Sequence, residues 1–245
     1  MRRNEKMAAI GQLAAGIAHE IRNPLASISG SIQLLKADNS TPENEKLFSI
    51  VLKEIDRLNL LITEFLDFAR PEGMPSDPIN PNTVLSEVMD MVAVNKQLPE
   101  GIRQERQLQS KSYILGQADK LKQVFLNLAI NAYQAMEGRE SSQLTVRSYE
   151  KDGHLLIEFE DNGAGMKPEI ANRIFEPFLT TKAKGTGLGL ATVHKILENH
   201  GAKIHLQTAP NEGTKFTLEF VLLNKDEMED LKNNVIDMQR RRSQG

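Results

Sequence analysis

The stretch Gly16-Ile17-Ala18-His19-Glu20-Ile21-Arg22-Asn23-Pro24-Leu25 lies inside a run whose apolar residues recur every three or four positions. This period is typical of an apolar stripe along one long helix, and it covers residues 7 to about 37. The stripe consists of Ile10, Leu13, Ile17, Ile21, Leu25, Ile28, Ile32 and Leu35. His19 lies two positions from two stripe members, so we expect its ring to be off the stripe and exposed.

The residues around His19 suit it to nucleophilic chemistry. An exposed imidazole has a pKa of about 6.5, and its neutral form is a competent nucleophile toward phosphorus. Glu20 is a neighbouring proton acceptor, Asn23 lies one helical turn on, and Pro24 predicts a bend in the helix. A solvated surface histidine is the alternative for His19 taken alone. The other histidines, which we expect to be ordinary strand or helix residues, are His154, His194, His200 and His205.

A second apolar stripe follows a break at Asp38-Asn39-Ser40-Thr41-Pro42, where Thr41 suits a helix cap and Pro42 the first helical position. Its members are Leu47, Val51, Ile55, Leu58, Ile62, Phe65 and Ala69. Because two helices make a thin core, we predict that residues 1–71 form a helical hairpin that pairs with a second copy as a four-helix bundle. A hairpin folded onto its own chain is the alternative.

Prolines separate this hairpin from a second domain. Their density at Pro71, Pro75, Pro78 and Pro81 predicts an extended linker over residues 72–82, followed by a domain at 83–223 and a tail at 224–245. Within the domain we expect helices at 84–95, 119–136 and 188–199, and strands at 102–108, 112–115, 143–149, 155–160, 203–208 and 214–222. This order indicates an α/β sandwich with its sheet covered on one face, so the fold class of the whole chain is α+β.

Polar residues of this domain suit a nucleotide and a metal ion. Asn127 and Asn131 project from one face of a helix, and amide oxygens are suitable ligands for Mg²⁺. Asp161 ends a strand, where its carboxylate is able to accept a hydrogen bond from the exocyclic amine of adenine. Gly163 and Gly165 follow and permit close backbone approach. Two surface asparagines and an ordinary Asp-Asn-Gly turn are the respective alternatives.

A glycine-rich stretch is the third nucleotide signal. Residues 174–182 predict the start of a mobile lid, with Phe175 and Phe178 as anchors and Lys182 and Lys184 within reach of phosphates. Gly185-Thr186-Gly187-Leu188-Gly189 then leads into a helix, and backbone N–H groups at a helix N-terminus bind phosphate oxygens. A simple flexible loop is the alternative, but the order and spacing of all these motifs favour the phosphate site.

The chain resembles the sensor histidine kinases of two-component signalling over nearly its whole length. The resemblance implies a dimeric phosphoacceptor hairpin and a Bergerat ATP-binding fold, shared with DNA gyrase and Hsp90-type chaperones. It also implies phosphorylation of His19 from ATP, Glu20 as base, and Asn23 positioning a water that dephosphorylates the partner, the receiver domain of a response regulator. By the same resemblance Asn131 is the principal Mg²⁺ ligand and Asn127 assists. The expected nucleotide contacts are Asn127, Asn131, Asp161, Gly163, Gly165, Phe175, Thr181, Lys182, Lys184, Gly185, Thr186, Gly187, Leu188, Gly189 and Thr214.

One motif departs from the commoner pattern of the family. Many members continue Asn-Ala-x-Lys-Tyr, whereas this chain has Asn131-Ala132-Tyr133-Gln134-Ala135, so the phosphate-binding cation is absent or moved to Lys182 or Arg173. The form resembles the nitrogen-regulation and pilus-sensor branch, whose partners act with sigma-54 promoters. An ATP-hydrolysing clamp is the main rival, but Asn127 stands where those enzymes carry a glutamate. A degenerate scaffold and a phosphatase-dominant protein are further alternatives.

Composition sets the outer limits. The 245 residues are 40% hydrophobic, enough for two cores, and the formal charge of −3 gives no sign of a nucleic-acid partner. The chain contains no cysteine, so disulfides and thiolate metal sites are excluded. No apolar run approaches the roughly 18 residues of a membrane helix. We therefore expect a cytoplasmic segment without membrane contact of its own, which is compatible with a parent protein anchored in the inner membrane.

Overall fold

The computed structural model describes residues 21, 23–35, 41–70, 73–182 and 185–223, in two compact units. The first unit contains the chain up to residue 72 together with Lys182–Leu188, and the second contains Gly73–Thr181 and the chain from Gly189 onward. His19, Glu20, Lys184 and the tail 224–245 lie outside the described residues.

The first unit carries the two predicted helices. Residues 23–35 are helical, and α2 spans Pro42–Ala69. The predicted cap is confirmed, because the Thr41 hydroxyl accepts a hydrogen bond from the Asn44 N–H at 3.3 Å and Pro42 occupies the first turn. Leu25 and Ile55 are buried. Other members of the two stripes remain exposed in the single chain, namely Ile21, Ile28, Leu35, Leu47, Val51 and Leu58.

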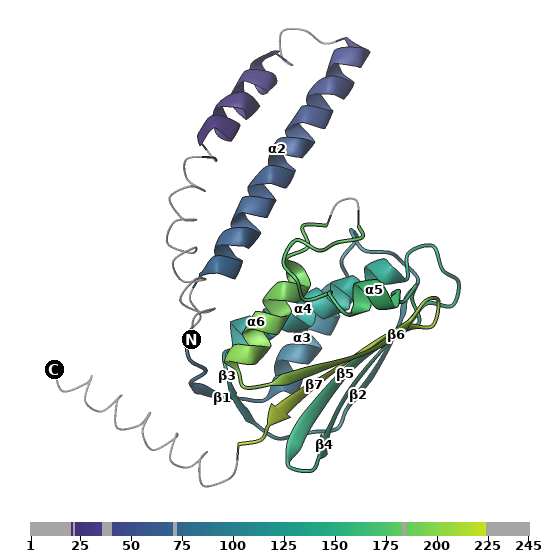
Figure 1. Cartoon of the computed structure of the whole chain (residues 1–245). Helices are drawn as coiled ribbons and strands as arrows, with labels where there is room; N and C mark the ends of the chain where they lie inside the picture. Colours follow the sequence, from purple (N-terminus) through teal and green to yellow (C-terminus); the bar gives the residue numbers. More distant parts are fainter. Residues whose placement is uncertain (1–20, 22, 36–40, 71–72, 183–184, 224–245) are drawn as a thin grey trace, which may run out of the picture. The chain divides into compact units, whose positions relative to one another are not determined.

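The second unit is built on a five-stranded sheet. The strands are β2 (Arg103–Leu108), β4 (Gln143–Lys151), β5 (His154–Asp161), β7 (Gly213–Val221) and β6 (Lys203–Ala209), in this spatial order. The β2–β4 pair is parallel and the others are antiparallel. Helices α3 (Pro81–Ala93), α4 (Ala118–Ala135) and α6 (Gly189–Asn199) cover one face (Figure 1), so the predicted sandwich is confirmed. A short helix, α5 (Pro168–Ala171), was not predicted.

Alternation along the strands separates the core from solvent. Leu144 and Val146 of β4 and Ile157 of β5 are fully buried toward the helices, where they meet Phe125 and Leu128 of α4 in one apolar cluster. The alternate residues of the same strands are mostly polar, with Leu156 as an exception. The sheet therefore has one apolar and one polar face, as the sequence pattern requires.

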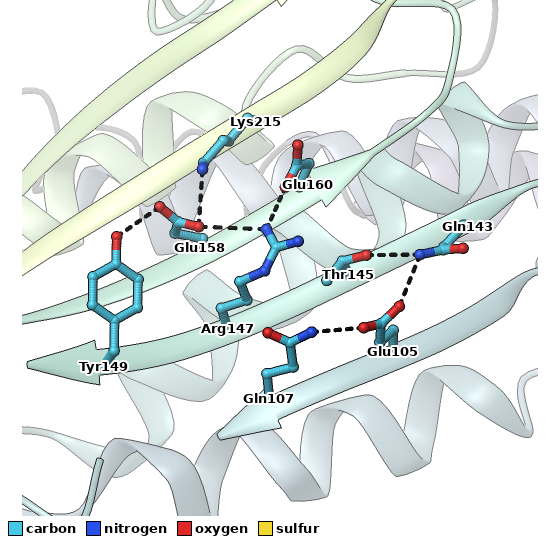
Figure 2. A network of polar contacts seen from close by, with 9 residues as sticks. All are labelled: Glu105, Gln107, Gln143, Thr145, Arg147, Tyr149, Glu158, Glu160 and Lys215. Carbon is cyan, nitrogen blue, oxygen red and sulfur yellow. Dashed lines mark hydrogen bonds and ion pairs between the residues drawn. The ribbon is translucent and has the colours of Figure 1, made fainter. Parts of the chain in front are cut away.

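A polar network covers the outer face of this sheet (Figure 2). Its centre is Glu158, only 6% exposed, which lies 2.9 Å from Lys215 Nζ, 2.9 Å from the Tyr149 hydroxyl and 3.6 Å from the Arg147 guanidinium. Burial alone would raise the pKa of Glu158, but the hydrogen bonds from Lys215 and Tyr149 outweigh it and lower that pKa. Arg147 also pairs with Glu160.

The proline-rich stretch contains regular structure. Residues 77–79 form β1 (Asp77–Ile79), which pairs antiparallel with β3 (Ile114–Gly116) in a separate two-stranded sheet. Pro78 lies within β1, and α3 begins at Pro81 behind an Asn80 cap. Much of the stretch 72–82 is therefore structured within the second unit, and strand pairing rather than local preference explains why.

Candidate functional site

Asn127, the first of the paired asparagines, lies where α4 meets the start of α6. Asn127 and Asn131 are half-buried on α4, and each is followed directly by a buried residue, Leu128 and Ala132 respectively. Gly189 is the first residue of α6, and a Cβ at this position would be 3.1 Å from the Asn127 Oδ1. The structure therefore brings Asn127 and the last glycine of the glycine-rich stretch together, with little space between them.

Asp161 supplies a buried carboxylate at the end of β5. It is 7% exposed, and its Oδ1 accepts a hydrogen bond from the Gly163 N–H at 2.8 Å. Burial raises the pKa of Asp161 to about 6, although the backbone N–H groups of Gly163 and Thr214 and the charge of Arg139 oppose the shift. A carboxylate that folding makes difficult to ionise has much to gain from a ligand that donates a hydrogen bond to it.

Thr214 stands beside Asp161 on the neighbouring strand. The two residues are register partners in the β5–β7 pair, and both are buried. The Thr214 hydroxyl lies 3.2 Å from the Thr208 hydroxyl, which also accepts from the Met166 N–H at 3.0 Å. Thr214 thus lies beside Asp161 in the sheet, and its contact with a nucleotide stays a prediction.

The loop after Asp161 is held against two other parts of the second unit. The Ala164 N–H donates to the Ala135 carbonyl at 2.9 Å, and the Ala164 carbonyl accepts from the Asn211 N–H at 2.7 Å. A Cβ on Gly163 would be 2.8 Å from the Ala135 oxygen, and one on Gly165 would be 1.9 Å from the Ala209 oxygen. Both glycines are therefore required by backbone packing within the apo fold, in addition to any role next to a base.

The segment predicted as a lid starts from an anchored aromatic. Phe175 is half-buried, and its ring centroid lies 5.1 Å from that of His194 on α6. Phe178, by contrast, is 59% exposed with a φ of 66°. Arg173, one of the two alternative phosphate cations, forms a surface ion pair with Glu176 at 2.7 Å. Thr181 and Lys182 are exposed.

Most of the glycine-rich stretch is described with the hairpin. Gly185, Thr186, Gly187 and Leu188 fall in the first unit, and the Thr186 hydroxyl donates to a Glu64 carboxylate oxygen on α2. Gly187 has a φ of 73°, in the left-handed region that glycine adopts readily. Within the second unit the structure brings Asn127 close to Gly189, and it brings Asp161 close to Gly163 and Thr214. Asn131 and Gly165 belong to the same unit, whereas Gly185–Leu188 belong to the first unit.

Two family models cover most of the chain. Residues 9–73 match the His Kinase A (phospho-acceptor) domain, and residues 116–224 match the histidine kinase-, DNA gyrase B- and HSP90-like ATPase domain. The chain belongs to the sensor histidine kinases of two-component signalling. The second unit is thus the ATP-binding domain of such a kinase.

Curated relatives and solved structures agree with this assignment. The chain is 40% identical to sporulation kinase A of Bacillus subtilis over 90% of its own length and 36% of the relative. It is 37% identical to the histidine kinase AtoS of Escherichia coli over 89% of its length and 36% of AtoS. For the sensor histidine kinase ZraS of Salmonella typhi these shares are 89% and 47%, again at 37% identity. The chain therefore spans less than half of each of these relatives.

Full-length ShkA in complex with AMPPNP resembles the structure with a TM-score of 0.70 and 26% identity, over 87% of this chain and 46% of ShkA. The kinase ThkA in complex with the response regulator TrrA has a TM-score of 0.62 at 24% identity, over 92% of this chain and 65% of ThkA, and supports the fold. Among the described residues of the present chain, no helix is long and apolar enough to span a bilayer.

Sequence reasoning missed one side-chain cluster of this kinase domain. His200, expected to be an ordinary residue, has both ring nitrogens engaged: Nδ1 lies 2.8 Å from the Ile196 carbonyl, and Nε2 accepts from the Gln117 N–H at 3.1 Å. Asn199 and Gln117 each donate to the backbone at the start of the second unit. Apart from the Ile196 carbonyl, the partners in these contacts are 43 to 126 positions away along the chain, so nothing local in the sequence signals them.

Proposed function

We propose that this chain transfers the γ-phosphoryl group of ATP to His19 and then to an aspartate of a response-regulator receiver domain. The observation that carries the proposal is the buried Asp161 carboxylate beside Thr214, and the Asn127 amide next to Gly189 is a second polar arrangement in the same domain. We assign the amides to the phosphates and a metal ion, and the buried carboxylate to the base. His19 itself lies outside the described residues, and its role rests on the phospho-acceptor family match.

The chemistry of phosphoryl transfer fits this set of residues. Transfer to a histidine depends mainly on positioning and on neutralising phosphate charge, so a pocket of amides, glycines and lysines is appropriate. We assign Mg²⁺ to Asn131, with Asn127 assisting, because hard amide oxygens complete a coordination sphere shared with phosphates and waters. The bound ion would neutralise phosphate charge. Among the described residues, no cluster of three or more acidic or histidine side chains offers an alternative metal site.

Asp161 is assigned to the adenine amine. Its carboxylate is buried and held by two backbone N–H groups, which leaves acceptor capacity for one further donor. An amine hydrogen bond to this oxygen would favour the ionised form that burial opposes. The carboxylate therefore selects a base that donates at that position.

The hairpin is assigned to a homodimeric four-helix bundle. The exposed stripe residues, such as Leu47 and Val51, form apolar surface that a single chain leaves in water. Burying it against a second copy gains roughly 25 cal/mol per Å². The regular spacing of three and four along both helices is the spacing that such packing uses.

We assign a response-regulator receiver domain as the partner that docks on the same hairpin. Asn23 is exposed on the first helix, four positions from His19, and is available to a docked receiver domain and to a dephosphorylating water. ThkA was solved with a response regulator, which supports a partner of the same kind here. The Asn-Ala-Tyr-Gln-Ala form favours a regulator that acts at sigma-54 promoters. We place these events in the cytoplasm.

Incubation with γ-labelled ATP and Mg²⁺ tests the proposal. The wild-type chain should acquire acid-labile, base-stable label, and His19→Ala should lose it while still binding a fluorescent ATP analogue. Asn131→Asp should lose both label and metal-dependent nucleotide binding. Steady phosphate release that survives His19→Ala, without label, would replace the kinase assignment with an ATP hydrolase.

A further inference from the structure

The backbone just after the hairpin is held by side chains of the ATP-binding domain. The Asn199 amide Nδ2, at the end of α6, donates to the Gly73 carbonyl at 2.7 Å. The Gln117 amide Nε2, just before α4, donates to the Met74 carbonyl at 3.4 Å. We call these two side chains and their two carbonyls the linker clasp. All four residues belong to the second unit.

Hydrogen bonds, rather than apolar burial, hold this segment. Gly73 and Ser76 are exposed, and the Met74 side chain is 80% exposed, so the segment gains little from the hydrophobic effect. A Cβ on Gly73 would be only 3.1 Å from the Gln117 Nε2, so the absence of a side chain permits the close approach. Beyond the clasp the chain enters β1, which is paired along its length with β3.

His200 braces the clasp from inside the domain. Because a carbonyl oxygen only accepts, the ring Nδ1 donates to the Ile196 carbonyl, and Nε2 accepts the hydrogen bond from the Gln117 N–H. A neutral ring thus ties the end of α6 to the residue that precedes α4. The backbone N–H of Gln117 is thus bonded to the ring of His200, the residue that follows Asn199 in the chain.

We propose that Asn199 and Gln117 are positioning residues for autophosphorylation: by docking Gly73 and Met74 they keep the tether between the hairpin and the ATP-binding domain short. The inference rests on the proposed transfer to His19. It concerns neither nucleotide contacts nor chemistry, because neither side chain belongs to the nucleotide site. The clasp recognises backbone carbonyls only, so it determines where the linker leaves the domain and not which side chains it carries.

The tether length gives the expected size of the effect. With the clasp closed, residues 70–72 separate the end of α2 at Ala69 from the docked Gly73. With the clasp open, the free chain extends to residue 76, just before β1 at Asp77. The effective concentration of one tethered partner near the other falls roughly as the −3/2 power of tether length. Lengthening the tether from residues 70–72 to 70–76 predicts a roughly threefold to fourfold lower phosphorylation rate.

The test compares Asn199→Leu/Gln117→Leu with wild type in the whole chain. Leucine removes the donors at similar volume, and the Gln117 side chain makes no capping hydrogen bond to α4 that would be lost. Gln207→Leu, at an exposed position on β6, is the matched control for adding exposed leucine. The measurements are affinity for a fluorescent ATP analogue and the initial rate of His19 labelling at saturating ATP.

We expect the clasp variant to label about threefold to fourfold more slowly, while its nucleotide affinity and that of Gln207→Leu stay at the wild-type value. A four-residue Gly-Ser-Gly-Ser insertion between Glu72 and Gly73 should slow labelling to a similar degree. In the chain that carries this insertion, Asn199→Leu/Gln117→Leu should lower the labelling rate only about twofold, because the tether is already long. A smaller loss of labelling rate in the chain with the insertion distinguishes a positioning role of the clasp from general destabilisation of the protein.

An unchanged or faster rate in the clasp variant overturns the inference, as does a loss of nucleotide affinity that accounts for the slower rate. Equal fold losses with and without the insertion also overturn it. Failure of the wild-type chain to label at all would instead refute the proposed function, so the two failures are distinguishable.

Discussion

The amide oxygen of Asn127 on α4 stands 3.1 Å from the position that a Cβ on Gly189, the first residue of α6, would occupy. This separation is tighter than most side-chain contacts, and its partner is the end of a side chain rather than backbone. The fold therefore tolerates a methyl group at Gly189 only if the Asn127 amide moves. A side chain at Gly189, a candidate phosphate contact, is therefore expected to displace Asn127, a candidate metal ligand.

Gly189→Ala should weaken Mg²⁺-dependent binding of an ATP analogue by about tenfold, equivalent to about 1.4 kcal/mol, and leave the fold intact. The physical reason is displacement of the Asn127 amide together with loss of a bare backbone at the start of α6. Titration with a fluorescent analogue measures it. Gly30→Ala is the control, because no atom lies within 4 Å of its Cβ and the residue is helical. Unchanged affinity in Gly189→Ala would contradict the assignment of this corner of the pocket.

Asp161 should make nucleotide selection depend on pH. Its pKa is raised to about 6, so the carboxylate that accepts the adenine amine is lost progressively as pH falls below this value. The preference for ATP over inosine triphosphate, which lacks the amine, should be largest above about pH 6 and should shrink below it. Phosphate titration is common to both nucleotides and cancels in the ratio of their dissociation constants. A ratio that stays constant from pH 5 to pH 8 would remove Asp161 from base recognition.

The same raised pKa predicts a gain in stability from Asp161→Asn. A carboxyl whose pKa rises from 3.8 to about 6 on folding binds more protons in the native state, so stability falls as pH rises through this window. The shift corresponds to roughly 3 kcal/mol, part of which the amide recovers at pH 8 without nucleotide. Urea unfolding of nucleotide-free protein at pH 4 and pH 8 tests it. Asp161→Asn should have a larger free energy of unfolding than wild type at pH 8 and should lose nucleotide binding. Equal free energies of unfolding at pH 8 would contradict a destabilising buried carboxylate at Asp161.

Glu158 should stabilise the outer face of the sheet without contributing to nucleotide binding. Glu158→Gln removes the partner of Lys215 and Arg147 and should cost about 2 kcal/mol at pH 7. Since the folded-state pKa is lowered, the contribution is present above the ordinary carboxyl range and is lost as pH falls through the lowered value. Urea unfolding at several pH values measures this. Glu160→Gln, on a side chain 44% exposed, is the matched control and should cost less than about 1 kcal/mol. Equal costs for the two variants would refute the distinction.

The exposed stripe of the hairpin should control oligomeric state. Val51→Glu/Leu58→Glu places charge on the stripe of α2 and should convert the dimer to a monomer, because burying an unpaired carboxylate at the bundle centre is costly. Analytical ultracentrifugation reports the mass. Leu60→Glu is the control, since this residue is 53% exposed on the same helix but lies off the stripe. A dimer that survives the double substitution, or is lost in Leu60→Glu alone, would move the interface elsewhere.

Elements with strong periodicity were predictable to within a few residues. The helix expected at 119–136 is α4 at Ala118–Ala135, and the strands expected at 143–149 and 155–160 are the centres of β4 and β5. Local preference and alternation suffice there because each residue's face follows from its neighbours. The segment around Pro78 behaves otherwise. It forms β1 because β3, more than thirty positions later, pairs with it.

The glycines after Asp161 show the same limit at the site. Their type and spacing indicated a nucleotide loop. Only the fold explains why residue 165 must be glycine: the Ala209 carbonyl oxygen, at the end of β6, would lie 1.9 Å from a Cβ at this position. The raised pKa of Asp161 likewise depends on burial that no local pattern reports. Residue types in a pattern therefore identify candidates, and packing decides the properties that those candidates have.

Periodicity and motif spacing alone predict the hairpin, the sandwich and the residue types of the candidate site in this chain, because helices and strands encode their buried faces over a few neighbouring positions. The tertiary structure decides the rest: the contact of Asn127 with Gly189, the pKa of Asp161, the Glu158 network and the docking of Gly73 by Asn199. Each of these joins residues from separate elements, and their distances depend on how the strands pair and the helices pack across the sheet.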